Sequence, residues 1–288
     1  MNLKFKLKLK ATGKIWLIAT EREIKLSDQT KLKQQVGQFE ASFSRFKTDS
    51  ELGILNAAGS LRSPSKKMLK LLRFALESYQ KTDGLFNVSV GGKLESSGYG
   101  LKNGGAKTSN NLIRDIEITN SYVKLRGGIH LDFGGFGKGW LADELHLSLN
   151  KMGYQNHLVN AGGDIRLGAQ TKQELLLADP LKKDYFIAKL NARGGALGCS
   201  SNSLRTWDFN NQKQQHILNL NNEKIKILGS FVYGENLGVA DMLATSLMLA
   251  NKKQRALISA NYREYSYFLV THKGYLKSNN WNHQLELL

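Results

Sequence analysis

Apolar and polar residues alternate along this chain with two different periods, one typical of strands and one typical of helices. Residues 4–19 alternate in steps of two and predict a pair of strands joined by a turn or bulge at residues 11–14. Apolar residues three and four positions apart predict four helices. The first is expected to begin at Ser27, with Ser27 or Asp28 as its cap, and the second to begin at Ser63. The third is expected to carry the apolar stripe Leu141–Met152, and the fourth to span Leu237–Ala250.

The remaining apolar runs are short and predict strands. They cover residues 85–90, 116–118, 122–125, 129–131, 157–159, 174–177, 186–190, 196–199, 216–220, 225–233 and 266–271. The glycine-rich segment 91–100 is expected to be a loop. Because strands and helices are mixed without regular βαβ alternation, we expect an α+β fold with mainly antiparallel sheets and packed helices. With only two prolines and no linker, one domain over residues 1–288 is expected.

Two glycine-rich turns lie between Gly128 and Asp164. The first follows Asp132 and leads into a helix, and the second, Asn160-Ala-Gly-Gly-Asp164, follows a strand. We expect the two turns to lie close together at one edge of a sheet. Glycines allow backbone N–H groups to approach an anion, and the start of a helix adds the positive end of its dipole. Lys138 stands where it would meet a phosphate, although the spacing is neither that of a P-loop nor that of a Rossmann turn.

The apolar helix Leu237–Ala250 contains a carboxylate. Asp241 and Thr245 are four residues apart and therefore share one face of this helix. An unpaired carboxylate buried among leucines costs several kcal/mol, roughly, so Asp241 needs a cation or a set of donors. Mg²⁺ fits, because it prefers carboxylate, hydroxyl and carbonyl oxygens. The alternatives are that Asp241 caps its own helix or pairs with a lysine.

The composition is strongly basic, with 41 Lys and Arg against 24 Asp and Glu and a net charge of +17. This balance suits an anionic ligand or a polyanionic partner. However, the basic residues are scattered along the chain except in Lys4–Lys10, and the aromatic motifs of RNA-binding proteins are missing. We therefore expect no nucleic-acid partner.

Cysteine content and hydropathy indicate in which cellular compartment the protein is expected. Cys199 is the only cysteine, which excludes an internal disulfide and a thiolate metal site, and we expect it to be a small buried residue rather than a nucleophile. The first residues lack the apolar core of a secretory signal. The longest apolar stretch, Leu237–Ala250, is too short to cross a bilayer. We expect no transmembrane segment and a cytoplasmic protein, or a periplasmic one if a leader was removed.

Five segments, in order, resemble motifs of one family, the FAD:protein FMN transferases or ApbE-type proteins. The segments are Asp49-Ser-Glu-Leu-Gly-Ile-Leu-Asn56, Gly84-Leu-Phe-Asn-Val-Ser-Val-Gly91, Leu131-Asp-Phe-Gly-Gly-Phe-Gly-Lys-Gly139 with Ala142-Asp143, Val159-Asn-Ala-Gly-Gly-Asp-Ile165 and Ala240-Asp-Met-Leu-Ala-Thr245. The resemblance covers nearly the whole chain, from Thr12 to the helix of Asp241. It implies an ApbE-like (T-fold-like) architecture.

The resemblance also implies ligands and a reaction. FAD contacts are implied at Thr12, Phe46, Ser97, Gly98, Tyr99, Asp132, Lys138 and Leu218. Mg²⁺ is implied at Asp241, Thr245 and the carbonyl of Gly135, with Ala244 adjacent. The implied reaction transfers the FMN moiety of FAD to a Thr or Ser hydroxyl of a client flavoprotein and releases AMP. Lys138 and Mg²⁺ would neutralise the diphosphate.

The chain departs from the family pattern mainly on the acceptor side. The family's Asp-Pro after the histidine is absent from His216-Ile-Leu-Asn-Leu, its Ser-Gly-Asp-Tyr turn reads Cys199-Ser-Ser-Asn202, and its Trp-Gly-Phe reads Ser97-Gly-Tyr99. His216 is either the base that activates the acceptor or a strand histidine.

Other histidines and other functions remain open from the sequence. We expect a surface or structural role for His130, His146, His157, His272 and His283, because they lack metal-ligand spacing. The alternatives to the transferase are an FAD pyrophosphatase that gives FMN and AMP, a non-catalytic flavin-binding protein, and a basic nucleic-acid binder.

Overall fold

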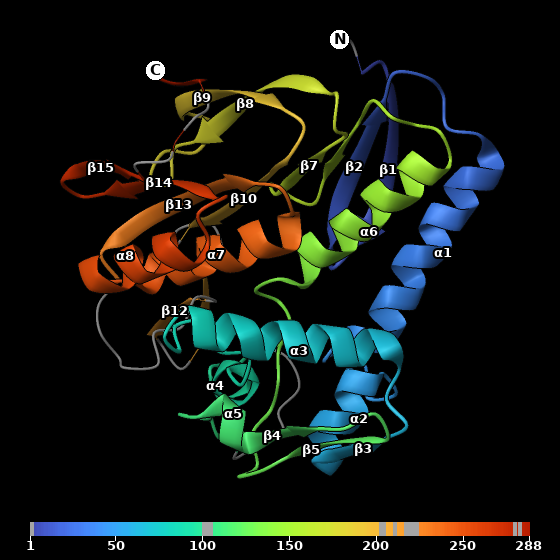
Figure 1. Cartoon of the computed structure of the whole chain (residues 1–288), viewed down its shortest axis with the longest axis vertical. Helices are drawn as coiled ribbons and strands as arrows, with labels where there is room; N and C mark the ends of the chain where they lie inside the picture. Colours follow the sequence, from blue (N-terminus) through green and yellow to red (C-terminus); the bar gives the residue numbers. More distant parts are fainter. Residues whose placement is uncertain are drawn as a thin grey trace.

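The computed structural model places a large antiparallel sheet at the centre of the molecule (Figure 1). It describes residues 3–99, 106–201, 206–209, 212–215, 225–278, 281 and 284–288. The sheet has eight strands in the order β1-β2-β6-β7-β10-β13-β14-β15. These strands are β1 (Phe5–Ala11), β2 (Lys14–Thr20), β6 (His157–Asn160), β7 (Ile165–Leu167), β10 (Ala196–Ser201), β13 (Ile227–Gly234), β14 (Ser266–Thr271) and β15 (Gly274–Lys277). The predicted α+β class is confirmed.

Three smaller sheets and eight helices complete the described part of the chain. The small sheets have the orders β3-β5-β4, β16-β9-β8 and β11-β12. Their strands are β3 (Ser60–Arg62), β4 (Ile116–Ile118), β5 (Tyr122–Leu125), β8 (Lys172–Ala178), β9 (Phe186–Arg193), β11 (Thr206–Phe209), β12 (Gln212–Gln215) and β16 (Gln284–Leu287). The helices are α1 (Leu26–Phe43), α2 (Glu51–Ala58), α3 (Lys66–Lys81), α4 (Gly91–Ser96), α5 (Leu112–Asp115), α6 (Gly137–Lys151), α7 (Leu237–Leu249) and α8 (Lys252–Asn261).

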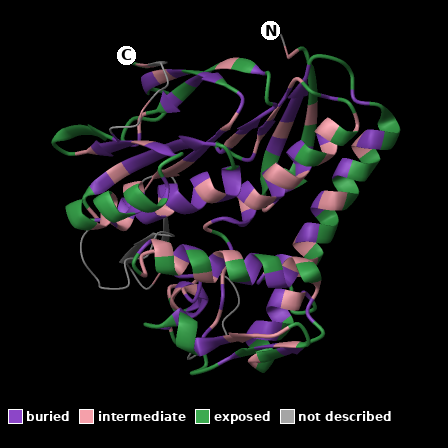
Figure 2. Cartoon of the chain, in the orientation of Figure 1, coloured by how far each residue is buried: buried purple, intermediate pink, exposed green. Residues whose placement is uncertain are grey.

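The layers follow from where the apolar faces lie. Helices α6 and α7 pack on one face of the large sheet, and β8 and β9 lie on its other side (Figure 1). Helix α7 is apolar almost all round and is buried nearly throughout, as Figure 2 shows, because it packs on the sheet and also contacts α6. Helices α2, α3 and α4 and the β3-β5-β4 sheet form a further layer, to which α1 runs from the large sheet (Figure 1).

Most local predictions are confirmed. Strands β1 and β2 pair through a tight turn in which Thr12 and Gly13 both have positive φ, 50° and 73°. Helix α3 begins after Ser65, whose side chain accepts a hydrogen bond from the N–H of Met68. Gly153, with φ of 82°, follows α6 as predicted. No helix in the described residues is long and apolar enough to span a membrane.

Segment 85–90 was predicted as a strand, and this prediction is wrong. Side chains accept hydrogen bonds from its backbone instead: Asn87 Oδ1 accepts from the N–H of Ser89, and Oγ1 of the preceding Thr82 accepts from the N–H of Phe86. Only one isolated bridge, Val90 to His130, remains. Residues 129–131 likewise form no strand, because only Ile129 and His130 make isolated bridges there. Part of the predicted loop 91–100 is helix α4.

The predicted cap of the first helix is also wrong. Helix α1 begins at Leu26 after Lys25, which makes no side-chain cap bond among the described residues. Asp28 lies inside the helix, where its carboxylate accepts from the hydroxyl of Tyr154 and pairs with Lys31. Several elements were not predicted, namely α2, α5, α8, β3, β7, β15, β16 and the β11-β12 hairpin. The predicted strand 216–220 lies outside the described residues.

Candidate functional site

Lys138 joins the two glycine turns to the carboxylate of helix α7. Its Nζ lies 2.8 Å from Oδ2 and 3.1 Å from Oδ1 of Asp241, and 3.1 Å from Oδ2 of Asp164. Lys138 is in the first turn of α6, whereas Asp164 follows the turn between β6 and β7. The predicted proximity of the two glycine turns is therefore confirmed. Of the alternatives for Asp241, the structure shows pairing with a lysine.

The carboxylates of Asp164 and Asp241 are buried beside a single ammonium group. Asp241 is only 2% exposed, and burial raises its pKa to about 7 although Lys138 opposes the rise and Asp164 adds to it. Its Oδ2 also accepts a long hydrogen bond, 3.3 Å, from the N–H of Gly139. Two carboxylates thus share one ammonium group, which is an arrangement that further positive charge would stabilise.

The residues around Asp241 fit a hard cation. Thr245 Oγ1 lies 3.3 Å from Oγ of Ser200 on β10. Ser230 is directly opposite Ser200 on β13, so both side chains are on the same sheet face, and its fully buried hydroxyl finds no hydrogen-bond partner among the described residues. Carboxylate and hydroxyl oxygens are the ligands that Mg²⁺ prefers. Lys138 provides the cationic charge in this structure.

The other two predicted metal positions are Ala244 on α7 and Gly135 in the first glycine turn. Ala244 is fully buried on α7, next to Thr245. Gly135 is in the first glycine turn, where a Cβ would lie 3.0 Å from the ring of Phe86. Within the described residues no three His, Cys, Asp or Glu side chains gather as a metal cluster. The assignment of these positions to Mg²⁺ therefore stays a prediction.

A buried arginine gathers three of the predicted FAD residues. The guanidinium of Arg45 lies 4.5 Å from the ring centre of Phe46 and 5.4 Å from that of Tyr99, and these rings meet edge to face at 5.8 Å. Its Nε donates to Oδ2 of Asp132, and its Nη2 donates to the Tyr99 carbonyl at 2.7 Å. Its Nη1 lies 3.6 Å from Glu95. Phe46, Tyr99 and Asp132 therefore form one cluster.

Neither Arg45 nor Glu95 was predicted as a site residue. The only local signal was that Arg45 precedes Phe46. The cluster extends to His130, whose Nδ1 lies 3.0 Å from Oε2 of Glu95. It also reaches the first glycine turn, because Oδ1 of Asp132 accepts from the N–H of Gly134 at 2.6 Å. The aromatic pair and the glycine turn are thus linked through one carboxylate.

Ser97 and Gly98 end helix α4 beside this cluster. Ser97 Oγ donates to the carbonyl of Leu94 at 2.8 Å. Gly98 has φ of +81°, and a Cβ there would come within 2.2 Å of the ring of Phe209 on β11. Only glycine fits this position without movement of the hairpin.

Two further predicted FAD residues and the predicted base have different outcomes. Thr12 lies in the β1–β2 turn, where its N–H donates to Glu40 Oε1 at 2.7 Å and its buried hydroxyl has no partner among the described residues. Lys14 of the same hairpin lies against the second glycine turn, at Gly162. His216 and Leu218 lie outside the described residues, so the role of each stays a prediction.

Cys199 lies next to the charged centre but is not suited to be a nucleophile. Its N–H donates to Oδ1 of Asp164 at 2.9 Å, which helps to fix that carboxylate. Burial, with the nearby carboxylates of Asp164 and Asp241, raises the pKa of the thiol well above its ordinary value. The thiol is therefore neutral at physiological pH.

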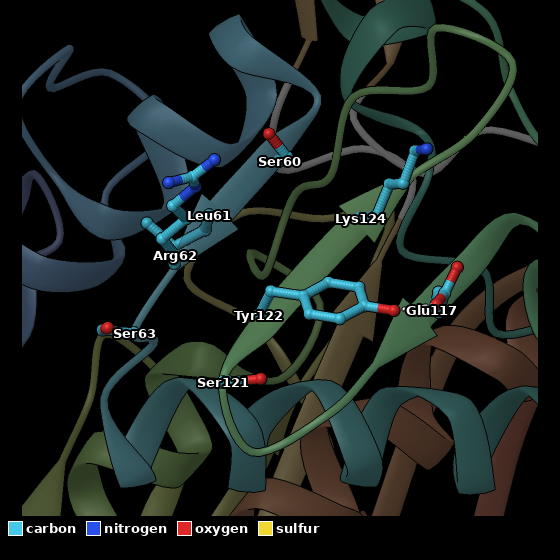
Figure 3. A pocket seen from close by; sticks show the side chains of 8 residues that line it. All are labelled: Ser60, Leu61, Arg62, Ser63, Glu117, Ser121, Tyr122 and Lys124. Atoms are coloured by element: carbon cyan, nitrogen blue, oxygen red, sulfur yellow. Dashed lines mark hydrogen bonds between the residues drawn. The ribbon is translucent and has the colours of Figure 1, made fainter.

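A separate hollow lies on the β3-β5-β4 sheet (Figure 3). It has a volume of about 500 Å³ over β3 and β5, and Tyr122 at its wall donates its hydroxyl to Glu117. Its lining residues are Ser60, Leu61, Arg62, Ser63, Glu117, Ser121, Tyr122 and Lys124. None of the predicted site residues lines it.

Comparison with known sequences identifies the family. The sequence model of the ApbE family matches residues 2–269. Since this match covers most of the 288 residues, the chain belongs to the ApbE family.

Two relatives with curated names share about a quarter of their aligned residues with this chain. A Rhodobacter capsulatus protein named FAD:protein FMN transferase is 25% identical over 249 residues, which is 78% of this chain and 47% of that protein. A Vibrio cholerae serotype O1 protein of the same name is 22% identical over 258 residues, which is 81% of this chain and 76% of that protein. The chain thus spans about half the length of the Rhodobacter relative.

Solved structures show the same fold. The ApbE protein of Thermotoga maritima has a TM-score of 0.83 at 19% identity and covers 96% of this chain and 97% of that one. The flavin transferase ApbE of Vibrio cholerae has a TM-score of 0.77 at 18% identity and covers 95% and 96%. The predicted ApbE-like architecture is confirmed.

Proposed function

We propose that residues 1–288 form one FAD:protein FMN transferase domain, which transfers FMN from FAD to a Thr or Ser hydroxyl of a client flavoprotein. The hydroxyl oxygen would form a bond to the FMN phosphorus, the diphosphate bridge would break, AMP would leave, and the hydroxyl proton would pass to a base. The observation that carries this proposal is the ammonium of Lys138 between two buried carboxylates, Asp164 at the end of the second glycine turn and Asp241 on α7. The family membership and the names of the two relatives support it.

Each part of the site has a task in this reaction. Phe46 and Tyr99 would flank the flavin, and Arg45 would hold both against Asp132. The backbone amides of the glycine turn would face the diphosphate. Phosphoryl transfer depends mainly on positioning and charge neutralisation, which is the chemistry that these groups supply.

Asp241 and Thr245, with the carbonyl of Gly135, are the residues proposed to hold Mg²⁺. The bound ion would neutralise charge on the diphosphate and on the leaving AMP. Lys138 would then exchange part of its contact with Asp241 for a phosphate oxygen. His216 is the proposed base for the acceptor hydroxyl.

The purified protein mixed with FAD and Mg²⁺ tests the proposal. We expect AMP together with FMN bound covalently to a client band, seen by in-gel flavin fluorescence, when an extract of the source cells is added. Free FMN with AMP would instead indicate the pyrophosphatase, and absence of AMP would indicate a flavin-binding protein.

A pair of variants makes the test specific. Lys138→Ala should lower AMP release at least a hundredfold, roughly the loss of one preorganised charge contact. Lys151→Ala removes an exposed lysine from the last turn of the same helix and should leave AMP release unchanged. Equal rates in the two variants would remove Lys138 from the site.

A further inference from the structure

Helix α7 receives its N-terminal cap from another helix. The carboxylate of Asp143 on α6 accepts from the N–H of Leu237 at 3.0 Å and from the N–H of Gly238 at 2.8 Å. Asn236, the residue at the N-cap position, makes no side-chain cap bond among the described residues. The first N–H groups of a helix need acceptors, and its positive dipole end favours a carboxylate. Asp143 therefore does for α7 what a local cap residue usually does.

Asp143 is itself held by a buried guanidinium. Nε of Arg166, on β7, donates to Oδ1 of Asp143 at 2.9 Å. Arg166 is 8% exposed, and its Nη1 donates to the carbonyls of Leu167 at 2.8 Å and Gly195 at 2.9 Å. Its Nη2 lies 3.1 Å from Nε2 of His146. A planar guanidinium fixed at several points allows Asp143 few positions.

The two helices touch at the level of the charged centre. A Cβ on Gly139 would come within 2.4 Å of the carbonyl oxygen of Leu237, so the first turns of α6 and α7 are in direct contact. The N–H of Gly139 also faces Asp241. Asp143 thus fixes α7 about one turn before Asp241, and Lys138 approaches that carboxylate from the same helix as Asp143.

We propose that Asp143 is a positioning residue that sets the register of α7, and with it Asp241 and Thr245, against Lys138. The inference rests on the proposed function for its catalytic consequence. Apart from Asp241 and Thr245, which contact Lys138 and Ser200, the side chains of α7 are almost all apolar or small, and apolar burial is non-directional. The two Asp143 bonds add a directional contact at the backbone of the first turn of α7, about one turn before Asp241.

The test uses one isosteric variant and one matched control. Asp143→Asn keeps the size of the side chain but loses the charge that holds two N–H groups and Arg166 together. Glu144→Gln makes the same change one residue later on α6, where the carboxylate pairs with Lys67 instead. Amide hydrogen exchange of the apo protein reports on Leu237 and Gly238, and FAD cleavage gives kcat and KM.

We expect exchange at Leu237 and Gly238 to be about tenfold faster in Asp143→Asn, the effect of losing a charged helix cap. We also expect kcat to fall at least tenfold while KM for FAD stays within about threefold, because a displaced Asp241 acts in the transition state. Glu144→Gln should change neither exchange nor kcat.

Two results would overturn the inference: unchanged exchange at both amides in Asp143→Asn, or faster exchange with an unchanged kcat. If the wild type cleaves no FAD, the proposed function fails, while the exchange result still decides whether Asp143 fixes α7. If Asp143→Asn does not fold, Arg166→Lys is the second variant, with the same expected direction and a smaller size, because lysine lacks the planar fork.

Discussion

Lys138 Nζ lies within 3.1 Å of both carboxylate oxygens of Asp241, a side chain that is only 2% exposed. This contact joins the first turn of α6 to the carboxylate of α7. It also leaves the centre electrostatically unbalanced, since Asp164 competes for the same ammonium group. The stability of the fold therefore favours a neutral side chain at position 241, whereas the proposed function needs the carboxylate.

Replacing Asp241 by asparagine should separate these demands. The folded-state pKa of Asp241 is raised to about 7, above its ordinary value of 3.8, so the folded protein binds the extra proton. Stability should therefore fall as pH rises from about 4 to about 7, by at most about 1.4 kcal/mol per pH unit. Asp241→Asn should lose this dependence and unfold at pH 8 no lower in temperature than the wild type, although FAD cleavage is abolished.

Thermal unfolding with and without Mg²⁺ checks this at pH 8. Mg²⁺ should raise the unfolding temperature of the wild type, because a ligand that binds only the folded state stabilises it, and should not raise that of Asp241→Asn. Glu174→Gln, an exposed change on β8, serves as the control and should respond like the wild type. A Mg²⁺ response that persists in Asp241→Asn would place the ion elsewhere.

Arg45→Lys should weaken flavin binding while keeping the charge. Lysine cannot reach Asp132 and the carbonyl of Tyr99 together, so the aromatic pair would lose its link to the glycine turn. We expect the Kd for FAD, measured by quenching of flavin fluorescence, to rise about tenfold or more, as for the loss of one charge-assisted contact. Arg73→Lys, on the exposed side of α3, is the matched control. Equal Kd values in both variants would exclude Arg45 from flavin binding.

The sequence indicated the charged centre because its residues stand in short motifs. Lys138 and Asp164 each adjoin a glycine turn, Asp241 interrupts an apolar helix, and both patterns are local. Arg45 carries no such mark. Its hydrogen-bond partners are more than forty residues away along the chain, and only the fold brings them together.

The wrong strand at 85–90 has a different cause. Leu85, Phe86, Val88 and Val90 give the apolar pattern of a strand, but Asn87 and Ser89 satisfy the backbone through their side chains. A buried turn of this kind needs no ladder partner, so periodicity cannot distinguish it from a strand. The role of Asp143 could not be predicted from local patterns either, because the N–H groups that it accepts from belong to a helix almost a hundred residues later.

Gly98→Ala should disturb the end of α4 more than a strained backbone alone explains. An L-residue at φ of +81° costs about 1–2 kcal/mol, and here the Cβ also meets the ring of Phe209 at 2.2 Å. Gly127→Ala is the matched control, because its φ is +71° and nothing lies within 4 Å of the Cβ. We expect Gly98→Ala to lower the free energy of unfolding by about 1–3 kcal/mol more than Gly127→Ala, as overpacking does. Equal losses in urea titrations would contradict the contact with Phe209.

The buried pair His146 and His157 should make the protein acid-sensitive. His157 Nδ1 lies 2.6 Å from the carbonyl of Tyr154 and must donate to it, so its Nε2 accepts from Nδ1 of His146 at 2.9 Å. Nε2 of His146 in turn accepts from Arg166. Every ring nitrogen thus has a fixed role in the neutral state, and a proton on either ring would oppose a neighbouring donor. The expected structural role of both histidines is confirmed.

Burial, together with Arg166, lowers the pKa of His146 to about 3 and that of His157 to about 4. Unfolded histidine binds its proton near pH 6.5, so in the window from about 6.5 down to about 4 the unfolded state gains protons that the folded state refuses. Each ring should therefore cost up to about 1.4 kcal/mol of stability per pH unit in that window. His157→Gln should show a shallower decline in urea titrations between pH 7 and pH 5. His272→Gln, which changes a histidine after β14 outside this pair, should decline as steeply as the wild type, and equal slopes in all three proteins would show that the buried pair does not resist protonation.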